Sequence, residues 1–240
     1  MTDTGKVALV TGGNKGIGFE VARQLAQLDH RVVLGSRDKD RGRIAATKLR
    51  SDGAQASYVA LDVSDPDSVT AAIRLIDQQY GRLDVLVNNA GIALPEGRPS
   101  EVPLDVLRRV YETNVFGLVA VTQAALPLLR RAEAGRIVNL SSGAGSLALV
   151  SGPDWRPEWN GLAYNTSKSA VNAVTVAFAS ELRETSIKVN AVNPGFTKTD
   201  MSPGAERTAA QGAAVVIRYA TLPADGPSGG FYDENGPIAW

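Results

Sequence analysis

The chain of 240 residues contains no cysteine and a single histidine. Without cysteine it can form no disulfide bond, no thiolate metal site and no catalytic thiol. One histidine excludes a multi-histidine metal site, and His30 stands just before an apolar run, where we interpret it as a surface turn residue. The sequence therefore predicts no metal centre and no serine–histidine–aspartate triad.

Net charge is also lacking, because 25 Lys and Arg residues balance 25 Asp and Glu residues. A neutral chain is a poor candidate for general binding to nucleic acid or to an anionic membrane. No apolar run reaches the ~18 residues that a membrane-spanning helix needs, and the first residues lack the charged-then-apolar layout of a secretory signal. We therefore expect a cytoplasmic protein without nucleic-acid or membrane partners.

What the sequence does contain is a regular alternation of short apolar runs and longer amphipathic stretches. The apolar runs predict strands at 7–10, 31–35, 57–61, 83–87, 136–140, 187–192 and 231–232. The amphipathic stretches predict helices at 16–28, 38–49, 65–80, 104–131 (broken or bent near its middle), 162–184 and 205–219. Apolar strands alternating with helices indicate an α/β fold with a parallel sheet covered on both faces. With no linker or repeat in sight, we expect one domain over residues 1–240.

A glycine-rich loop joins the first predicted strand to the first predicted helix, from Thr11 to Gly18. Glycines let a backbone turn tightly and approach a pyrophosphate, which the free N–H groups of a helix N-terminus bind. A simple turn is the alternative, but the strand–loop–helix context favours a dinucleotide site of the Rossmann type. The residues expected to form it are Gly12, Asn14, Lys15, Gly16, Ile17 and Gly18.

The end of the second predicted strand indicates which dinucleotide binds. A carboxylate there binds the ribose 2′-hydroxyl of NAD, whereas an arginine accommodates the 2′-phosphate of NADP. Here the position is Arg37, and Asp38 beside it is expected to cap the following helix. Arg37 and Lys15 together favour NADP(H) as the cofactor; the alternative is that Arg37 is merely solvated.

The ends of the next two predicted strands complete the expected cofactor site. Asp62 and Val63 are expected to flank the adenine, with the Asp62 carboxylate accepting from its amino group. Asn89, Ala90 and Gly91 are expected near the adenine ribose, and the alternative is a plain turn.

Tyr164 and Lys168 stand four positions apart in a predicted helix and therefore share one face. A free tyrosine, with a pKa of about 10, is a poor proton donor or acceptor at neutral pH. An ammonium about 4 Å away stabilises the phenolate by up to roughly 4 kcal/mol at an effective dielectric near 20, and desolvation opposes it. We therefore expect a lowered phenol pKa; the alternative is a chance pair on the surface.

Six motifs in order make the chain resemble the short-chain dehydrogenase/reductase family over essentially its whole length. They are Thr11-Gly-x-x-x-Gly-x-Gly18, Asn88-Asn-Ala-Gly91, Asn114, Ser141-Ser-Gly-Ala-Gly145, Tyr164-x-x-x-Lys168 and Asn193-Pro-Gly-Phe-Thr-Lys-Thr199. The glycine loop and Gly35-Ser-Arg-Asp38 are most similar to the carbonyl reductase branch. The resemblance implies an NADPH-dependent oxidoreductase that reduces a small-molecule ketone or aldehyde to an alcohol by hydride transfer.

The resemblance also implies a role for each matching position. Tyr164 is the general acid for reduction or the base for oxidation, and Lys168 lowers its pKa and holds the nicotinamide ribose. Ser142 binds the substrate oxygen, where negative charge develops, and Asn114 interrupts its helix and holds a water that links Lys168 to solvent. The residues implied around the nicotinamide are Pro194, Gly195, Thr197 and Thr199.

The chain departs from the carbonyl reductase branch between Ser142 and Tyr164. That branch carries a long insertion there, whereas here the two residues lie 22 positions apart. The extra residues include Trp155 and Trp159, which either wall the substrate pocket or pack their loop onto the body of the protein. Without the insertion, helices 104–131 and 162–184 have a face free to associate, so we favour a homo-oligomer (dimer or tetramer), with a monomer as the alternative.

The segment 197–222 is rich in alanine and glycine and is expected to form a mobile substrate lid with few polar contacts. Two other functions are considered. One is a different reaction on this scaffold, dehydration or epimerisation, which needs further acid–base groups that the sequence does not show. The other is a non-catalytic protein that senses NADP(H), for which the catalytic residues would be dispensable.

Overall fold

The computed structural model describes residues 5–156 and 159–240, and this part of the chain forms a mainly parallel sheet. The strands are β1 Val7–Thr11, β2 Arg31–Ser36, β3 Ala56–Ala60, β4 Val85–Asn88, β5 Arg136–Leu140, β6 Lys188–Val192, β7 Phe231–Asp233 and β8 Gly236–Pro237. Their order is β3-β2-β1-β4-β5-β6-β7-β8, and only the pairing of β7 with β8 is antiparallel. The predicted doubly wound α/β sheet is confirmed.

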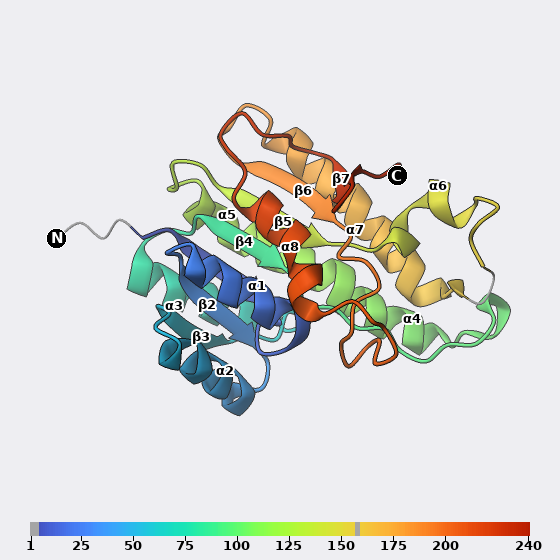
Figure 1. Ribbon diagram of the computed structural model, residues 1–240, viewed down its shortest axis with the longest axis horizontal. Coiled ribbons are helices and arrows are strands. Elements are labelled where there is room, and N and C mark those ends of the chain that lie inside the picture. Colours follow the sequence, from blue (N-terminus) through green and yellow to red (C-terminus); the bar gives the residue numbers. More distant parts are fainter. Residues whose placement is uncertain (1–4, 157–158) are drawn as a thin grey trace.

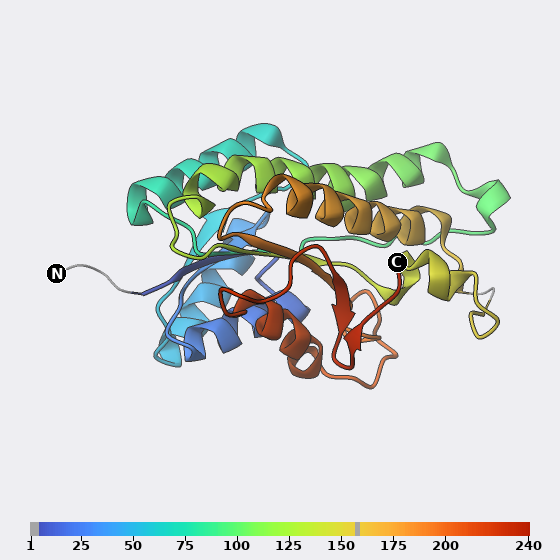
Figure 2. The same ribbon diagram turned by 90° about the horizontal axis from the view of Figure 1, so that it is seen from above.

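Helices cover both faces of this sheet (Figure 1). They are α1 Gly16–Gln27, α2 Lys39–Ser51, α3 Pro66–Tyr80, α4 Leu104–Tyr111, α5 Gly117–Leu129, α6 Leu147–Val150, α7 Leu162–Glu181 and α8 Ala209–Ala220. Figure 2 shows the sheet nearly edge-on, with α3, α5 and α7 on one side and α1, α2 and α8 on the other. The molecule is thus a three-layer sandwich of helix, sheet and helix.

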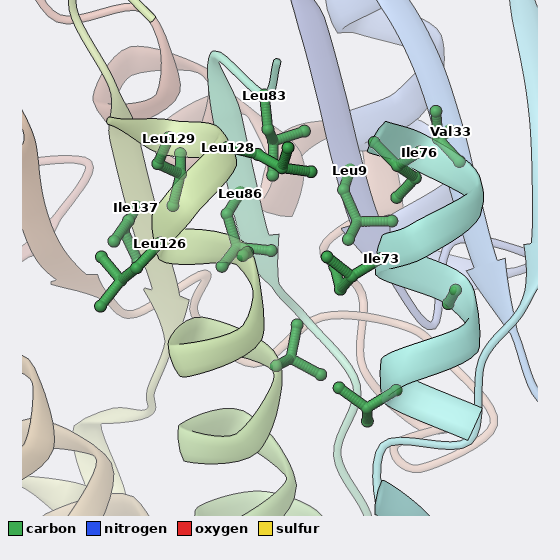
Figure 3. Packing of buried hydrophobic residues seen from close by; sticks show 14 of the residues in the cluster. Leu9, Val33, Ile73, Ile76, Leu83, Leu86, Leu126, Leu128, Leu129 and Ile137 are labelled. Carbon is green, nitrogen blue, oxygen red and sulfur yellow. The ribbon is translucent and has the colours of Figure 1, made fainter. Parts of the chain in front are cut away.

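Each face of the sheet has its own hydrophobic core. On one face, Leu9 and Leu86 from the strands meet Ile73 from α3 and further apolar residues of α5 and α7 (Figure 3). On the other face, Val10 and Leu34 lie in a second cluster with residues of α1, α2 and α8. Because both faces are covered, the loops that leave the carboxyl edge of the strands are the parts placed to hold a ligand.

The position of β1 in the sheet indicates where a ligand is expected at that edge. β1 pairs with β2 on one side and with β4 on the other. The connections that leave these neighbouring strands run in opposite directions, and in open parallel sheets such a switch point is where ligands bind. The glycine-rich loop after β1 and the segment after β4 lie on the two sides of this point.

The predicted strands are all present, with ends displaced by at most two residues. The predicted break in helix 104–131 is confirmed, since α4 and α5 are joined by a π-helical turn, Glu112–Phe116. The stretch Leu104–Leu129 is not a continuous apolar run, but by length and mean hydropathy it is apolar enough to cross a membrane. However, 56% of its apolar window is buried within the fold, which is typical of a core helix.

The interpretation of His30 as a surface residue is wrong. Its side chain is 7% exposed, and Nδ1 donates to Leu28 O over 2.9 Å. Burial lowers the pKa of His30. The turn itself is present, and His30 N donates to Leu25 O over 3.1 Å.

Candidate active site

The glycine-rich loop has the backbone shape that a phosphate-binding loop needs. Gly12 and Gly16 have φ angles of +62° and +56°, in the left-handed region that favours glycine. A Cβ on Gly18 would collide with the Asn89 amide and lie 2.6 Å from Gly12 O. In the described part of the chain no side chain caps α1, and its first turn has no acidic residue. The N–H groups and positive dipole end of α1 are therefore available to an anion.

Asn89 holds this loop in place from the neighbouring strand. Its Nδ2 donates to Thr11 O over 2.8 Å and to Gly12 O over 3.2 Å. In return, Thr11 Oγ1 accepts from the backbone N–H groups of Asn89 and Ala90 over 3.0 and 2.9 Å. The Asn89 amide is thus used to fix the loop, and any contact of this segment with a ribose falls to its backbone.

The residues expected to distinguish NADP from NAD lie at the end of β2. Arg37 is exposed and makes no hydrogen bond or ion pair with any other residue that the structure describes. Asp38 caps α2 as predicted, since its carboxylate accepts from Asp40 N and Arg41 N over 3.1 and 3.0 Å. Arg37 is therefore an uncompensated cation at the position where a 2′-phosphate is expected.

Lys15, the second expected cation, has a partner in the chain. Its Nζ forms an ion pair with the Asp200 carboxylate, and this contact lowers the pKa of Asp200. Both side chains are exposed, so the pair contributes little to stability. It does, however, join the glycine-rich loop to the segment after β6.

At the expected adenine position, Asp62 lies in a local turn. Its Oδ1 accepts from Ser64 N and Ser64 Oγ over 3.0 and 2.6 Å. Val63 is 7% exposed and packs against Gly117, where an added Cβ would lie 2.8 Å from it. Val63 therefore has a packing role, and its contact with the adenine stays a prediction.

Lys168 lies deep in the site, on the same helix as Tyr164. It is 6% exposed, and its Nζ donates to Leu140 O over 2.7 Å. Nζ lies 5.7 Å from the centre of the Tyr164 ring. A Cβ on Gly91 would lie 3.7 Å from Nζ and 3.3 Å from Asn114 Oδ1, so these three positions meet at one point.

Asn114 sits in the π-helical turn between α4 and α5, where the helix widens. Its Oδ1 accepts from Ile92 N over 2.8 Å, and its Nδ2 donates to Ile92 O and Ser167 Oγ over 2.9 and 3.0 Å. The predicted interruption of the helix by Asn114 is thus present, and the amide ties the segment after β4 to α7.

Ser142, and not its neighbour Ser141, faces the Tyr164 phenol. The Ser142 side chain lies near enough to the Tyr164 phenol to lower its pKa, and it accepts from Ala144 N over 3.2 Å. Ser141 is 3% exposed and donates to the Lys168 carbonyl over 3.3 Å. Ser142, the serine to which the resemblance gives the substrate oxygen, is therefore the one that lies beside the phenol.

The expected lowering of the Tyr164 pKa is wrong for this structure. Burial raises the pKa of Tyr164, and the hydrogen bond with Ser142 opposes it without reversing it. Burial also lowers the pKa of Lys168 to about 8. The ammonium is bonded to Leu140 O and not to the phenol. Desolvation therefore outweighs the charge on Lys168.

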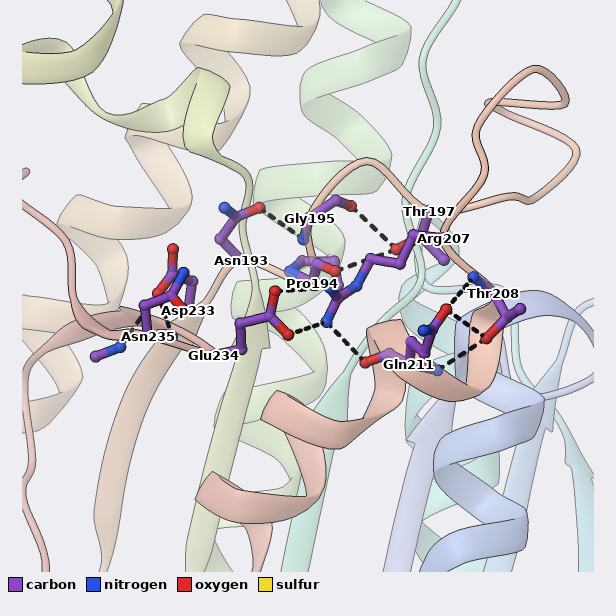
Figure 4. A network of polar contacts seen from close by, with 11 residues as sticks. Asn193, Pro194, Gly195, Thr197, Arg207, Thr208, Gln211, Asp233, Glu234 and Asn235 are labelled. Atoms are coloured by element: carbon purple, nitrogen blue, oxygen red, sulfur yellow. Dashed lines mark hydrogen bonds and ion pairs between the residues drawn. The ribbon is translucent and has the colours of Figure 1, made fainter.

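A polar network fixes the segment that follows β6 (Figure 4). Arg207 forms a two-pronged ion pair with Glu234, with both N–O distances 2.7 Å, and donates to Gln211 O over 3.0 Å. Its side chain packs against Gly195, which has a φ of +76° and where a Cβ would lie 3.3 Å from Arg207 Cδ. The turn that contains Pro194 and Gly195 is thereby attached to α8 and to the β7–β8 turn.

The expected lid 197–222 needs correction. Its second half is α8, whose Val215, Val216 and Tyr219 are buried in the core, so that half is not a lid. The Arg207 network also contradicts the expectation of few polar contacts. A lid confined to 197–208 stays a prediction.

Two threonines of this remaining lid face different surroundings. Thr197 is 3% exposed, and its hydroxyl donates to Pro194 O and Gly195 O, both over 3.1 Å. A direct cofactor contact through that hydroxyl stays a prediction. Thr199 lies above Gly16, where a Cβ would be 3.4 Å from its methyl group.

Trp155 and Trp159 pack on each other in a T-shaped arrangement, with ring centres 5.4 Å apart. Trp155 Nε1 donates to Asn160 over 2.9 Å, and Trp159 O accepts from Asn165 over 3.1 Å. These contacts support the view that the pair shapes its own loop. A role in the substrate pocket stays a prediction, and residues 157–158 lie outside the described part of the chain.

The sequence is similar to characterised reductases along almost its full length. A family model described as short chain dehydrogenase matches residues 6–210. The chain is 35% identical to salutaridine reductase of Papaver bracteatum, with 95% of this chain and 94% of the relative covered. It is 33% identical to carbonyl reductase (NADPH) 1 of Mus musculus, with all of both chains covered. That alignment runs over 281 positions against 240 residues here, so the mouse protein has residues without a counterpart.

Solved structures give the same result. The NADPH-bound carbonyl reductase from chicken fatty liver superposes with a TM-score of 0.85 at 30% identity, over 98% of this chain and 99% of that one. Salutaridine reductase from Papaver somniferum superposes with a TM-score of 0.83 at 31% identity, over 95% and 99% of the two chains. With fold and sequence in agreement, we conclude that this chain belongs to the short-chain dehydrogenase family of oxidoreductases, in its carbonyl-reductase-like branch.

Proposed function

We propose that the protein is an NADPH-dependent reductase that converts a ketone or aldehyde to an alcohol by hydride transfer. The observation that carries this proposal is the placement of the Ser142 hydroxyl beside the Tyr164 phenol, with Lys168 one turn further along α7 and its Nζ 5.7 Å from the centre of the phenol ring. These groups lie at the carboxyl edge of the sheet, where the glycine-rich loop also ends. A proton donor and a second hydrogen-bond donor are thus placed together, as carbonyl reduction requires.

The residues present fit a nicotinamide dinucleotide. The uncapped N-terminus of α1 and the cradle at Gly12, Gly16 and Gly18 suit the pyrophosphate. Arg37, which has no partner in the described chain, suits a 2′-phosphate, and no carboxylate occupies that position. The names of the mouse and chicken relatives include NADPH, which supports the same choice. When bound, the reduced nicotinamide supplies the hydride.

Residues of the chain itself supply the proton and stabilise the charge that its transfer leaves. In the proposed reaction Tyr164 donates its proton to the carbonyl oxygen, while Ser142 donates a hydrogen bond to the same oxygen. The raised pKa of Tyr164 keeps the phenol protonated at neutral pH, which suits a general acid. Lys168, with a pKa of about 8, is mostly charged at neutral pH and stabilises the phenolate that forms.

The proposal includes one catalytic domain over residues 1–240, with a lid at 197–208 that closes toward the glycine-rich loop. The Lys15–Asp200 ion pair and the contact of Thr199 with Gly16 support such a closed position. The expected homo-oligomer and the expected cytoplasmic location stay predictions.

The test follows NADPH absorbance with a panel of aldehydes and ketones, for the wild type and for Tyr164→Phe. We expect the variant to lose about 10²- to 10⁴-fold in kcat, as general acid catalysis is lost, while it still binds NADPH. Tyr80→Phe is the control, because it removes a phenol on α3 that bonds only Ser57 among the described residues. Full activity of Tyr164→Phe would refute the proposal. Tight NADPH binding by the wild type without turnover of any carbonyl would favour the NADP(H)-sensing alternative.

A further inference from the structure

The helix that carries Tyr164 and Lys168 begins without a local cap. Gly161 occupies the cap position of α7 and has no side chain to offer, and the first turn contains no acidic residue. A helix start leaves backbone N–H groups without an intrahelical acceptor, and these need a partner when they are buried. The catalytic helix therefore depends on some other part of the chain for its first turn.

That partner is Glu96, on the loop between β4 and α4. Its Oε2 accepts from Ala163 N over 2.7 Å, and its Oε1 accepts from Tyr164 N over 3.2 Å. These are the second and third residues of α7, the positions whose N–H groups a local cap side chain would accept. Glu96 thus caps the helix although it precedes Ala163 by 67 positions and Tyr164 by 68 positions in the chain.

We propose that Glu96 is a positioning residue for catalysis: it fixes the first turn of α7 and so places the Tyr164 phenol against Ser142. The carboxylate suits this task, because negative charge at a helix N-terminus is favourable and its hydrogen bonds to N–H groups are strong. One of the two bonds ends on the backbone of Tyr164 itself. The placement of the proton donor is therefore linked directly to this loop.

Gly161 is matched to this carboxylate. A Cβ on Gly161 would lie 2.5 Å from Glu96 Oε1, closer than real Cβ atoms approach an oxygen. The backbone does not require glycine, because its φ of −89° and ψ of 118° suit any residue. The absence of a side chain at this position is thus explained by the space that Glu96 occupies.

Glu96 is also the last of several anchors along the segment from Asn88 to Glu96. Asn89 binds the glycine-rich loop, and Ile92 is bonded in both directions to Asn114. The same short segment therefore contacts, in order, the phosphate-binding loop, the π-helical turn and the start of the catalytic helix. This continuity lets one rigid connection set the distance between the cofactor site and the proton donor.

This inference rests on the proposed function, and its test uses kcat as the main measurement. Loss of a cap changes the equilibrium constant for an ordered first turn by about 5- to 30-fold. We expect Glu96→Ala to lower kcat measurably, by up to that factor, well below the melting temperature and with the KM for NADPH little changed. Glu96→Gln keeps one acceptor oxygen and should recover part of the loss.

Glu101→Ala is the matched control. Glu101 lies on the same loop and is exposed, so its removal makes the same change in net charge without touching α7. A purely structural role of Glu96 would lower the melting temperature without lowering kcat in the folded protein. Unchanged kcat in Glu96→Ala, or an equal loss in Glu101→Ala, would overturn the inference.

Gly161→Ala tests the contact between Glu96 and the first turn of α7 by a change in α7 instead of in Glu96. Its new methyl group should displace the Glu96 carboxylate and lower kcat to a similar extent. In the double variant with Glu96→Ala, Gly161→Ala should have almost no further effect, because the displaced group is already gone. Additive losses would contradict the inference.

The failure of this inference can be distinguished from failure of the proposed function. If Tyr164→Phe keeps full activity, the proposed function is wrong. If Tyr164→Phe is inactive but Glu96→Ala is fully active, only the role of Glu96 is wrong.

Discussion

Replacing Lys168 by methionine is expected to stabilise the protein at neutral pH while abolishing the proposed activity. The Lys168 ammonium is buried and, within the described part of the chain, donates its hydrogen bond to Leu140 O and pairs with no carboxylate. Burial lowers its pKa from the ordinary 10.5 to about 8. The folded protein therefore holds a charge in a place that disfavours it.

The size of the effect follows from that pKa. A change from 10.5 to about 8 corresponds to about 3 kcal/mol of destabilisation while the lysine is charged. Methionine fills a similar volume without the charge, but it leaves Leu140 O without its donor, which costs about 1–3 kcal/mol. The net gain expected at pH 7 is about 1 kcal/mol.

The pH dependence gives the sharper test. Below pH 8 the lysine is protonated in both the folded and the unfolded protein, so the full destabilisation is present. Between pH 8 and 10.5 the folded protein releases its proton first, and the free energy of unfolding of the wild type rises. By pH 9.5 this rise amounts to about 2 kcal/mol, so the methionine variant should have become the less stable of the two.

Urea unfolding of both proteins at pH 7 and pH 9.5 measures this difference. Lys39→Met is the control, since Lys39 is exposed on α2 and its replacement should give a difference that hardly depends on pH. A Lys168→Met variant that is less stable at both pH values by the same amount would refute the reasoning. NADPH oxidation by the same preparation should be lost, because no cation remains to stabilise the phenolate.

Three further predictions concern the cofactor, the substrate and pH. Arg37→Ala should raise the KM for NADPH by roughly 10- to 100-fold, the value of a charged hydrogen bond, and leave NADH kinetics unchanged; equal effects on both cofactors would contradict its role. Trp155→Ala should change the relative kcat/KM across a panel of carbonyls, and unchanged values would reject a pocket role. The kcat/KM for reduction should be level up to about pH 8 and fall above it, as Lys168 loses its charge; a profile that stays level to pH 10 would show that this charge is not needed.

The sequence was sufficient where the relevant signal is local. Strands and helices follow from hydrophobic periodicity, and the predicted break in helix 104–131 is present as a π-helical turn. The glycine positions in the loop after β1 follow from backbone conformation. The family resemblance implies that Ser142 binds the substrate oxygen, and in the structure Ser142 lies beside Tyr164.

Features that depend on contacts between distant parts of the chain were missed. Asp200, Arg207 with Glu234, and Glu96 act on residues that lie 27 to 185 positions away, and nothing in the sequence marks such pairs. The predicted lid 197–222 is too long, because the alanine and glycine residues of α8 allow close packing on α1 and do not indicate mobility. His30 was misplaced for a similar reason, since burial is decided by tertiary packing.

The Tyr164 pKa is raised and not lowered, and this changes the role that Lys168 can have. Burial drives both groups toward their neutral forms, the phenol by raising its pKa and the amine by lowering its own. At neutral pH the buried ammonium of Lys168 lowers the stability of the fold, and an apolar side chain at this position would be more stable. Lys168 matters most after the phenol has given up its proton, when the site must hold a phenolate. The buried charge then lowers the energy of the product of proton transfer, although it does not make the resting phenol acidic.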